Sequence, residues 1–298
     1  MRDAAQRRLA VGFFDGVHLG HQAILANAAA ALTFRQHPLS VIAPERAPRL
    51  LMSVEERVAA IRACGVEDVT VLDFTPELAG MSAEDFSGKL VAAGQNGQDA
   101  RSPVDRSGVI VRCGANWRFG AGGKGDAAFL RAHGIDVEVV GYAEHGGELV
   151  SSSRIRKSLE EGRVEDAAAM LGRSYEVGGS VVSGKGLGKE LGYPTINIDA
   201  GRPLCLRLGV YAVELAGTPG IANYGRAPTM DEAAWPHPVL EVHLFGAVPD
   251  MPSERTSVRI LRFLRDERKF ASPEELKRQI ESDCENVRGA LLQRGNAS

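Results

Sequence analysis

The sequence predicts two domains of different fold class, a parallel α/β sheet domain followed by an antiparallel β domain, with a boundary near residues 172–175. Three observations support this division. A chain of 298 residues is long for one hydrophobic core. The first half alternates strand-like and helix-like segments, as parallel sheets with covering helices do. The second half holds short β-rich runs between glycine and proline turns, which is typical of a barrel or a sandwich.

In the first half, apolar runs and helix-start signals mark the expected elements. Ser53 is followed three residues later by Glu56, which is the pattern of a capping box. The polar, glycine-rich stretch 94–107 is expected to be a surface loop. We expect strands at 9–14, 32–34, 69–72, 108–113 and 137–141, and helices at 22–31, 54–63, 82–92, 127–133, 153–161 and 164–171. The segment between the first two strands is short for a right-handed βαβ crossover.

In the second half, β-branched and aromatic residues gather in five short runs. They predict strands at 175–182, 195–198, 210–215, 239–245 and 257–263. Ser272 and Pro273 then supply the N-cap and the first helical residue of a long terminal helix.

Composition excludes several classes of protein. Hydrophobic residues make up 44% and charged residues 24%, which is ordinary for a globular chain. A net charge of −3 does not predict a nucleic-acid partner. The four cysteines are far apart and form no CxxC pair, so reduced thiols are expected rather than a zinc cluster. No signal segment and no apolar run of membrane-spanning length is found, so we expect a cytoplasmic protein without a membrane partner.

The most informative stretch follows the first strand and reads FFDGVHLGH. His18 and His21 lie where a helix begins, and Gly16 and Gly20 allow a ligand to approach the backbone. A helix N-terminus favours an anion, and imidazole N–H groups can stabilise charge on a phosphate. A metal site is a weaker interpretation, because zinc-binding histidines on a helix are usually four residues apart with a carboxylate nearby. Histidines that only cap the helix are the structural alternative.

Two further segments suit a nucleotide. In SSSRIR, the hydroxyls of Ser152 and Ser153 and the permanent charge of Arg156 lie at an expected helix start. In GANWRFG, Asn116 can contact a ribose or a base while the neighbouring aromatic residues pack. His37 ends the second strand, on the side where α/β sheets bind ligands. A serine cap, a glycine-bounded loop and a surface histidine are the respective structural alternatives.

The second half contains a glycine-rich stretch, GKGLGKELGYPTINI, at 184–198. It does not form a Walker loop, because Gly186 stands where that loop needs a serine or threonine. Gly184, Gly186 and Gly188 instead suit a flap whose amides contact ATP phosphates, or a plain glycine turn.

Three polar residues of the expected β strands suit phosphoryl transfer. Thr195 and Asn197 are two residues apart, so they share a face in an extended strand, and their oxygens suit Mg²⁺. Glu241 alternates with apolar neighbours and can accept a proton from an attacking alcohol. Polar residues on the outer face of a barrel are the structural alternative for all three.

Several blocks, taken in order, resemble the bifunctional bacterial riboflavin kinase/FAD synthetase family. DGVHLGH is similar to the HxGH signature of nucleotidyltransferases, and TFRQHP, GANWRFG and SSSRIR are similar to further blocks of the FAD synthetase half. GKGLGKELGYPTINI, GVYAVEL and LEVHLF resemble riboflavin kinase. The resemblance implies a Rossmann-like nucleotidyltransferase domain at 1–172. At 173–298 it implies a riboflavin kinase domain, a six-stranded antiparallel β-barrel with a C-terminal helix.

The resemblance implies phosphorylation of riboflavin to FMN with Mg²⁺ and ATP, then adenylylation of FMN to FAD. Its partners are the small molecules riboflavin, FMN and ATP, and no oligomeric state follows from it. For the kinase it implies Glu241 as base, Thr195 and Asn197 as Mg²⁺ ligands, Gly184, Lys185, Gly186 and Gly188 at ATP, and Asn223, Arg226 and Thr229 at the flavin. For the adenylyltransferase it implies His18, His21 and Arg156 as catalytic residues, and Phe13, Gly16, Gly20, Asn116, Ser152 and Ser153 at ATP.

The chain departs from the family pattern in three places. The segment between Gln22 and Thr33 is shorter than in the family, beside the predicted ATP site. Gln36 stands where the family has proline, and the tyrosine-glycine pair after LEVHLF is absent. Two alternatives follow. One is a riboflavin kinase with a degraded adenylyltransferase domain. The other is a flavin-binding protein without catalysis. The presence of Thr195, Asn197 and Glu241 argues against this second alternative.

Overall fold

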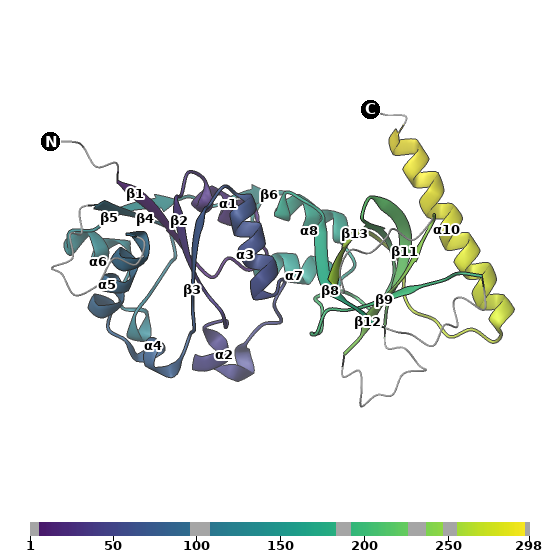
Figure 1. The fold of residues 1–298 in the computed structure, drawn as a ribbon, viewed down its shortest axis with the longest axis horizontal. Coiled ribbons are helices and arrows are strands. Elements are labelled where there is room, and N and C mark those ends of the chain that lie inside the picture. Colours follow the sequence, from purple (N-terminus) through teal and green to yellow (C-terminus); the bar gives the residue numbers. More distant parts are fainter. Residues whose placement is uncertain (1–5, 96–107, 183–191, 226–236, 247–254, 296–298) are drawn as a thin grey trace. The chain divides into compact units, whose positions relative to one another are not determined.

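The computed structural model describes residues 6–95, 108–182, 192–225, 237–246 and 255–295 (Figure 1). The chain divides into two compact units, Met1–Ser152 and Ser153–Ser298. The first is built on a parallel sheet and the second on a closed antiparallel barrel, so the predicted fold class is confirmed in both.

The first unit is built on a five-stranded parallel sheet with the strand order β3-β2-β1-β4-β5 (Figure 1). Its strands are β1 (Arg7–Val11), β2 (Ala30–Phe34), β3 (Asp68–Leu72), β4 (Val109–Gly114) and β5 (Asp136–Val140). Leu9 on β1 lies opposite Ala30 on β2 and Val111 on β4. The chain winds outward from β1 in both directions, so the order reverses between β1 and β4. Sheets of this kind bind ligands at such a switch point, beyond the carboxyl ends of the strands.

The segments outside the sheet contain the helices of the first unit. They are α1 (Leu19–Leu25), α2 (Leu39–Ile42), α3 (Val54–Ala63), α4 (Pro76–Gly80), α5 (Ala83–Gly94) and α6 (Ala127–Ala132), with 3-10 turns η1 (Pro44–Arg46) and η3 (Ala121–Gly123) and a small hairpin of β6 (Glu144–His145) and β7 (Glu148–Leu149). The predicted capping box is confirmed: Ser53 Oγ accepts from Glu56 N at 3.2 Å, and the Glu56 carboxylate accepts from Ser53 N at 2.5 Å. α3 therefore begins at the expected residue.

The core of the first unit lies between the sheet and α5. Phe86 and Leu90 of α5 are buried in one cluster with Leu9 and Val111 of the sheet. Arg112 follows Val111 by one residue and therefore faces the opposite side of the sheet, where it contacts α1. The sheet is thus covered on both faces, as parallel sheets are.

The helix expected over 22–31 is wrong in its second half. α1 ends at Leu25, and Asn27 has a φ of 58°, a left-handed conformation that does not continue a helix. Ala30 and Ala31 belong to β2, where they are buried. The high helix propensity of alanine is overridden here, because small side chains pack closely at the centre of the sheet.

The second unit is a closed six-stranded barrel with the order β10-β11-β12-β9-β8-β13 (Figure 1). Its strands are β8 (Tyr175–Val182), β9 (Ile196–Asp199), β10 (Gly209–Leu215), β11 (Thr218–Gly225), β12 (Val239–Leu244) and β13 (Arg255–Arg265). β13 pairs with both β8 and β10, which closes the barrel. Tyr211, Tyr224 and Val242 are among its buried side chains.

The sequence runs located five of these strands and missed β11. Pro219, Gly220 and Gly225 give this segment the composition of a turn. The structure explains Gly220, because a Cβ there would overlap the backbone carbonyl of His243 on β12. In the sequence Gly220 indicates a turn, but in the structure it allows the close approach of β11 and β12.

Three helices complete the second unit. α7 (Ser152–Glu160) and α8 (Val164–Leu171) precede the barrel, and α8 packs against β8 and β13. α10 (Pro273–Gly295) follows it, and Ser272 Oγ accepts from Glu275 N at 3.3 Å, which confirms the predicted cap. Cys284 and Val287 of α10 are buried against Val210, Ala212 and Ile221 on the outer face of the barrel.

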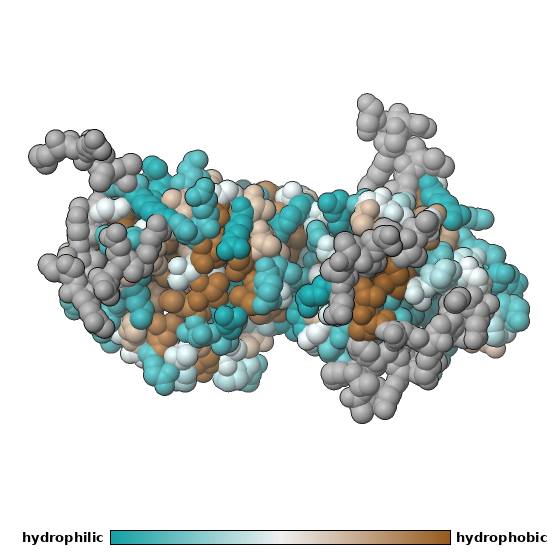
Figure 2. All heavy atoms as spheres, viewed as in Figure 1, coloured by the Kyte–Doolittle hydropathy of each residue, from teal (hydrophilic) through white to brown (hydrophobic). Residues whose placement is uncertain are grey.

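Figure 2 shows apolar residues over the middle of the first unit and in a patch on the second, with hydrophilic residues around them. Within the residues that the structure describes, no helix has both the length and the apolar character needed to cross a membrane.

Candidate functional site

The turn between β1 and α1 has an unusual backbone. Phe14 and Val17 have φ values of 59° and 41°, and Gly16 has 83°. A positive φ is uncommon for residues with a side chain and least common for β-branched residues such as valine. Both non-glycine side chains are buried, with 1% exposed. The turn therefore stores strain, which persists only where the surrounding structure enforces it and which is typical of ligand sites.

Asp15 holds this turn from inside. Its carboxylate is 2% exposed and accepts hydrogen bonds from Leu51 N at 3.0 Å and Met52 N at 3.2 Å. Its backbone carbonyl accepts from Ser152 Oγ at 2.8 Å. A buried carboxylate is tolerated only with such donors. The predicted ATP-binding residue Ser152 thus lies directly against the predicted phosphate turn.

The two histidines of the motif meet at the start of α1. His18 is the N-cap, and its Nδ1 accepts from His21 N at 3.3 Å. The two rings are stacked, with centroids 3.6 Å apart. A Cβ on Gly20 would lie 3.2 Å from His18 Cε1, so a glycine leaves room for the ring across the first turn. The structure therefore brings His18, His21 and Gly20 together.

His21 is a neutral ring at pH 7. Its Nδ1 is buried and has no hydrogen-bond partner among the described residues. Burial, and secondarily the nearby His18, lower the pKa of His21 well below its ordinary value of 6.5. A neutral imidazole offers one N–H donor and one acceptor nitrogen. The ring can therefore meet a ligand as a hydrogen-bonding group rather than as a fixed positive charge.

An arginine from the sheet supports the short helix behind the histidines. Arg112 Nη2 donates to the carbonyl of Ala23 at 3.2 Å, and its Nη1 donates to the carbonyl of Ala26. A cation at the C-terminal end of a helix satisfies carbonyls that have no partner within the helix. A helix of seven residues is not stable alone. Arg112 ties its far end to β4, so the shortened crossover still presents both histidines.

Asn116 follows β4 and therefore lies on the other side of the switch point from the histidines. A Cβ on Gly114 would lie 3.7 Å from both Asn116 Oδ1 and Ile24 Cδ1, so the Asn116 amide is close to α1. Trp117 and Phe119 stack at 4.7 Å and pack on the core, as predicted. Asn116 itself is exposed and available to a ligand.

Phe13 and His37 meet beyond the ends of β1 and β2. Their ring centroids are 4.7 Å apart in an edge-to-face arrangement. The guanidinium of Arg57 lies 4.1 Å from the Phe13 centroid and donates to the carbonyl of Phe34. Burial lowers the pKa of Arg57 to about 10, so it stays protonated at pH 7. This buried cation fixes the aromatic residue that begins the motif.

In the second unit, three predicted residues form one polar row across neighbouring strands. Glu241 on β12 lies opposite Asn197 on β9 and opposite Asn223 on β11. Directly opposed residues in an antiparallel pair are on the same face and in reach of one another. Asn197 is 6% exposed and Glu241 is half-buried. Burial, and then the nearby Glu267, raise the pKa of Glu241, which makes this carboxylate a stronger base.

The expectation that Thr195 and Asn197 share one strand is off by one residue. β9 begins at Ile196, so Thr195 precedes the strand and is exposed. Pro194 has no N–H group to continue the ladder. Its carbonyl instead accepts a hydrogen bond from His243 Nδ1 at 3.0 Å.

The remaining predicted residues are placed as follows. Ser153 and Arg156 are in the second unit on α7, where Arg156 Nη1 donates to Ser153 Oγ at 3.5 Å. Gly184, Lys185, Gly186, Gly188, Arg226 and Thr229 lie outside the described residues.

Three residues of the first unit were missed from sequence. Asp15 had a signal, because an acidic residue inside an apolar run indicates a buried carboxylate with donors. Arg57 and Arg112 had none, since their partners are backbone carbonyls far away in the sequence.

Comparison with known proteins gives matches in both units. A family model described as FAD synthetase matches residues 1–154, and one described as riboflavin kinase matches residues 171–291. A bifunctional riboflavin kinase/FMN adenylyltransferase from Escherichia coli K12 is 31% identical, covering 92% of this chain and 90% of the relative. Proteins of the same name from Pseudomonas fluorescens and Bacillus subtilis are 32% and 30% identical over similar shares, 93% and 94% of this chain and 91% of each relative.

A solved structure has a similar fold. It is described as a macrolide-efflux protein from Streptococcus pneumoniae, with 26% sequence identity and a TM-score of 0.76. The match covers 95% of this chain and 94% of the other.

Replacing the carboxylate at position 15 tests how the turn is held. In Asp15→Asn, an amide group would face the backbone N–H donors of Leu51 and Met52. We therefore expect the free energy of unfolding to fall by about 2 kcal/mol. The control is Asp73→Asn, which breaks an exposed pair with Arg35 and should cost less than about 1 kcal/mol. Urea unfolding followed by circular dichroism measures both, and equal losses would contradict the role of Asp15.

The depressed pKa of His21 makes part of the stability depend on pH. Near and below pH 6.5 the unfolded chain binds a proton at this ring that the folded chain does not, so the free energy of unfolding falls as pH is lowered through that range. Between about pH 7.5 and about pH 5.5, wild type should lose more thermal stability than His21→Ala. An identical loss in both proteins would show that the ring is not buried as a neutral group.

Proposed function

The chain belongs to the bifunctional riboflavin kinase/FMN adenylyltransferase family, and we propose which of its side chains perform each reaction. It phosphorylates riboflavin to FMN with ATP, and it joins FMN to the AMP part of a second ATP to give FAD. The observation that carries the assignment is the pair of preorganised sites, one in each unit: the strained histidine turn and the polar row of the barrel.

In the kinase reaction, Glu241 is the base. Its raised pKa suits a group that takes the proton from the primary alcohol of riboflavin as the oxygen attacks the γ-phosphorus of ATP. The bond from that phosphorus to the bridging oxygen breaks, and ADP leaves. Asn197 and Asn223 flank Glu241 on either side, so phosphate and alcohol can meet at this carboxylate.

Asn197 and Thr195 would hold Mg²⁺ together with the phosphates of ATP. Their amide and hydroxyl oxygens are the hard donors that Mg²⁺ takes, and this ion usually keeps substrate oxygens and waters as its other ligands. Among the described residues, no group of three or more histidine, cysteine or acidic side chains is placed to hold a metal. The two oxygens of Thr195 and Asn197 fit an ion that arrives with its nucleotide and neutralises phosphate charge.

The remaining kinase assignments rest on the family pattern. It assigns Gly184, Lys185, Gly186 and Gly188 to ATP and assigns Arg226 and Thr229, with Asn223, to the flavin.

In the adenylyltransferase reaction, the protein positions two substrates and stabilises charge. An oxygen of the FMN phosphate attacks the α-phosphorus of ATP in line, and pyrophosphate leaves. His18 and His21 donate to the α-phosphate above the N-terminal end of α1. Phe13, Gly16, Gly20, Asn116 and Ser152 bind the nucleotide in the same unit. The family pattern also assigns Ser153 to ATP and Arg156, with its permanent charge, to catalysis.

The proposed domain limits follow function rather than compactness. Residues 1–172 form the adenylyltransferase domain, because α7 carries the serines and the arginine assigned to ATP, and residues 173–298 form the kinase domain.

We place the protein in the cytoplasm, which its four free cysteines support.

Glu241→Gln tests the kinase assignment. We expect the kcat for FMN formation to fall by about 10²- to 10⁴-fold, because the amide cannot accept the proton. FAD formation from added FMN should stay at the wild-type rate. Chromatography separates FMN from FAD and measures both. Glu176→Gln is the control, since Glu176 is an exposed glutamate on another strand of the same barrel. Wild-type turnover in Glu241→Gln would exclude it as the base.

His21→Ala tests the adenylyltransferase assignment. FAD formation from FMN should fall by about 10²-fold or more, as expected when a donor to the developing charge is lost. FMN formation should persist. His133→Ala is the matched control, because His133 lies in the same unit and stacks on Phe129 away from the motif. If His21→Ala makes FAD normally, the histidines have been assigned wrongly.

A further inference from the structure

Glu267 lies beside the polar row of the barrel, in the segment between β13 and α10 (residues 266–272, the β13–α10 connector). Its Oε1 accepts from Asn223 Nδ2 at 3.2 Å. A Cβ on Gly225 would overlap the same carboxylate, so Glu267 occupies the space that any side chain at position 225 would need. The carboxylate is therefore in contact with two residues of β11, one of which is opposite Glu241.

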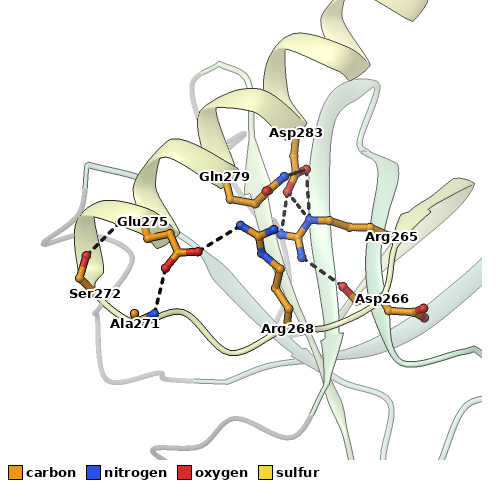
Figure 3. Close-up of polar contacts among 8 residues, drawn as sticks. All are labelled: Arg265, Asp266, Arg268, Ala271, Ser272, Glu275, Gln279 and Asp283. Carbon is orange, nitrogen blue, oxygen red and sulfur yellow. Dashed lines mark hydrogen bonds and ion pairs between the residues drawn. The ribbon is translucent and has the colours of Figure 1, made fainter.

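Ion pairs hold the β13–α10 connector in place. Arg265, which precedes it, makes a bidentate pair with Asp283 of α10, and Asp283 is 4% exposed (Figure 3). Gln279 Nε2 donates to the same carboxylate at 2.8 Å. Within the connector, Asp266 pairs with Arg207 at 2.6 Å. Glu267 thus projects from a segment that is fixed to the barrel and to the terminal helix.

The connector is also fixed at its C-terminal end. Glu275 in the first turn of α10 accepts from Ala271 N at 3.0 Å and pairs with Arg268 at 3.5 Å (Figure 3). Because both ends are tied down, Glu267 can hold its partner in a defined orientation rather than following it.

A carboxylate accepts hydrogen bonds and does not donate them, so it fixes which way the Asn223 amide faces. Nδ2 faces Glu267, and the acceptor Oδ1 lies on the other side of the amide. We propose that Glu267 is a positioning residue of the kinase site, which orients Asn223 so that its Oδ1 accepts a hydroxyl of the riboflavin side chain next to Glu241. This inference rests on the proposed roles of Glu241 and Asn223.

Two substitutions in the full chain test the orientation of Asn223. Glu267→Gln keeps an oxygen that accepts from Asn223, so the KM for riboflavin should stay near wild type. Glu267→Ala loses the hydrogen bond, and its KM for riboflavin should rise by about tenfold.

Two controls show that the effect is specific. Glu285→Ala removes an exposed glutamate of α10 and should not change the KM for riboflavin. FAD formation from FMN and the thermal unfolding temperature, measured for each variant, show that the chain is folded.

A wild-type KM for riboflavin in Glu267→Ala would overturn the proposal. If Glu241→Gln is inactive as a kinase in the same assays, a wild-type KM in Glu267→Ala removes only the role of Glu267. If Glu241→Gln is active, the proposed base itself fails.

Discussion

The first site depends on one buried carboxylate. Asp15 is buried, and hydrogen bonds from the backbone N–H groups of Leu51 and Met52 stabilise its carboxylate there. Those hydrogen bonds also hold a turn in which Phe14 and Val17 have positive φ values. The carbonyl of the same residue receives Ser152 from far along the chain. One residue therefore joins the end of β1, the segment before α3 and Ser152, the last residue of the first unit.

The second site depends on strand register instead. Asn197, Glu241 and Asn223 lie on three different strands and meet because the barrel pairs them directly. A slip of one residue would turn Glu241 to the other face. Gly220 lets β11 approach β12 closely, and Gly225 leaves room for the Glu267 side chain. The barrel thus builds its site with backbone pairing, whereas the first unit builds its site with a strained turn.

Local signals in the sequence predicted much of this. The capping box at Ser53, the cap at Ser272 and the strand over 175–182 are short-range patterns, and the structure confirms all three. The helix over 22–31 was wrong because burial in β2 overrode the helix propensity of alanine. β11 was missed because close strand packing requires residues that otherwise indicate turns. Arg112 and Glu267 were not predictable, since their partners come together only through the tertiary fold.

We assign the two reactions to separate sites that share FMN as product and substrate. Mixing two variants, His21→Ala and Glu241→Gln, and following FAD formed from riboflavin and Mg-ATP tests this most directly. Neither variant alone should convert riboflavin to FAD at the wild-type rate. The mixture should form FAD, because FMN made by His21→Ala is used by Glu241→Gln. Wild-type FAD formation by either variant alone, or none in the mixture, would contradict two separate sites.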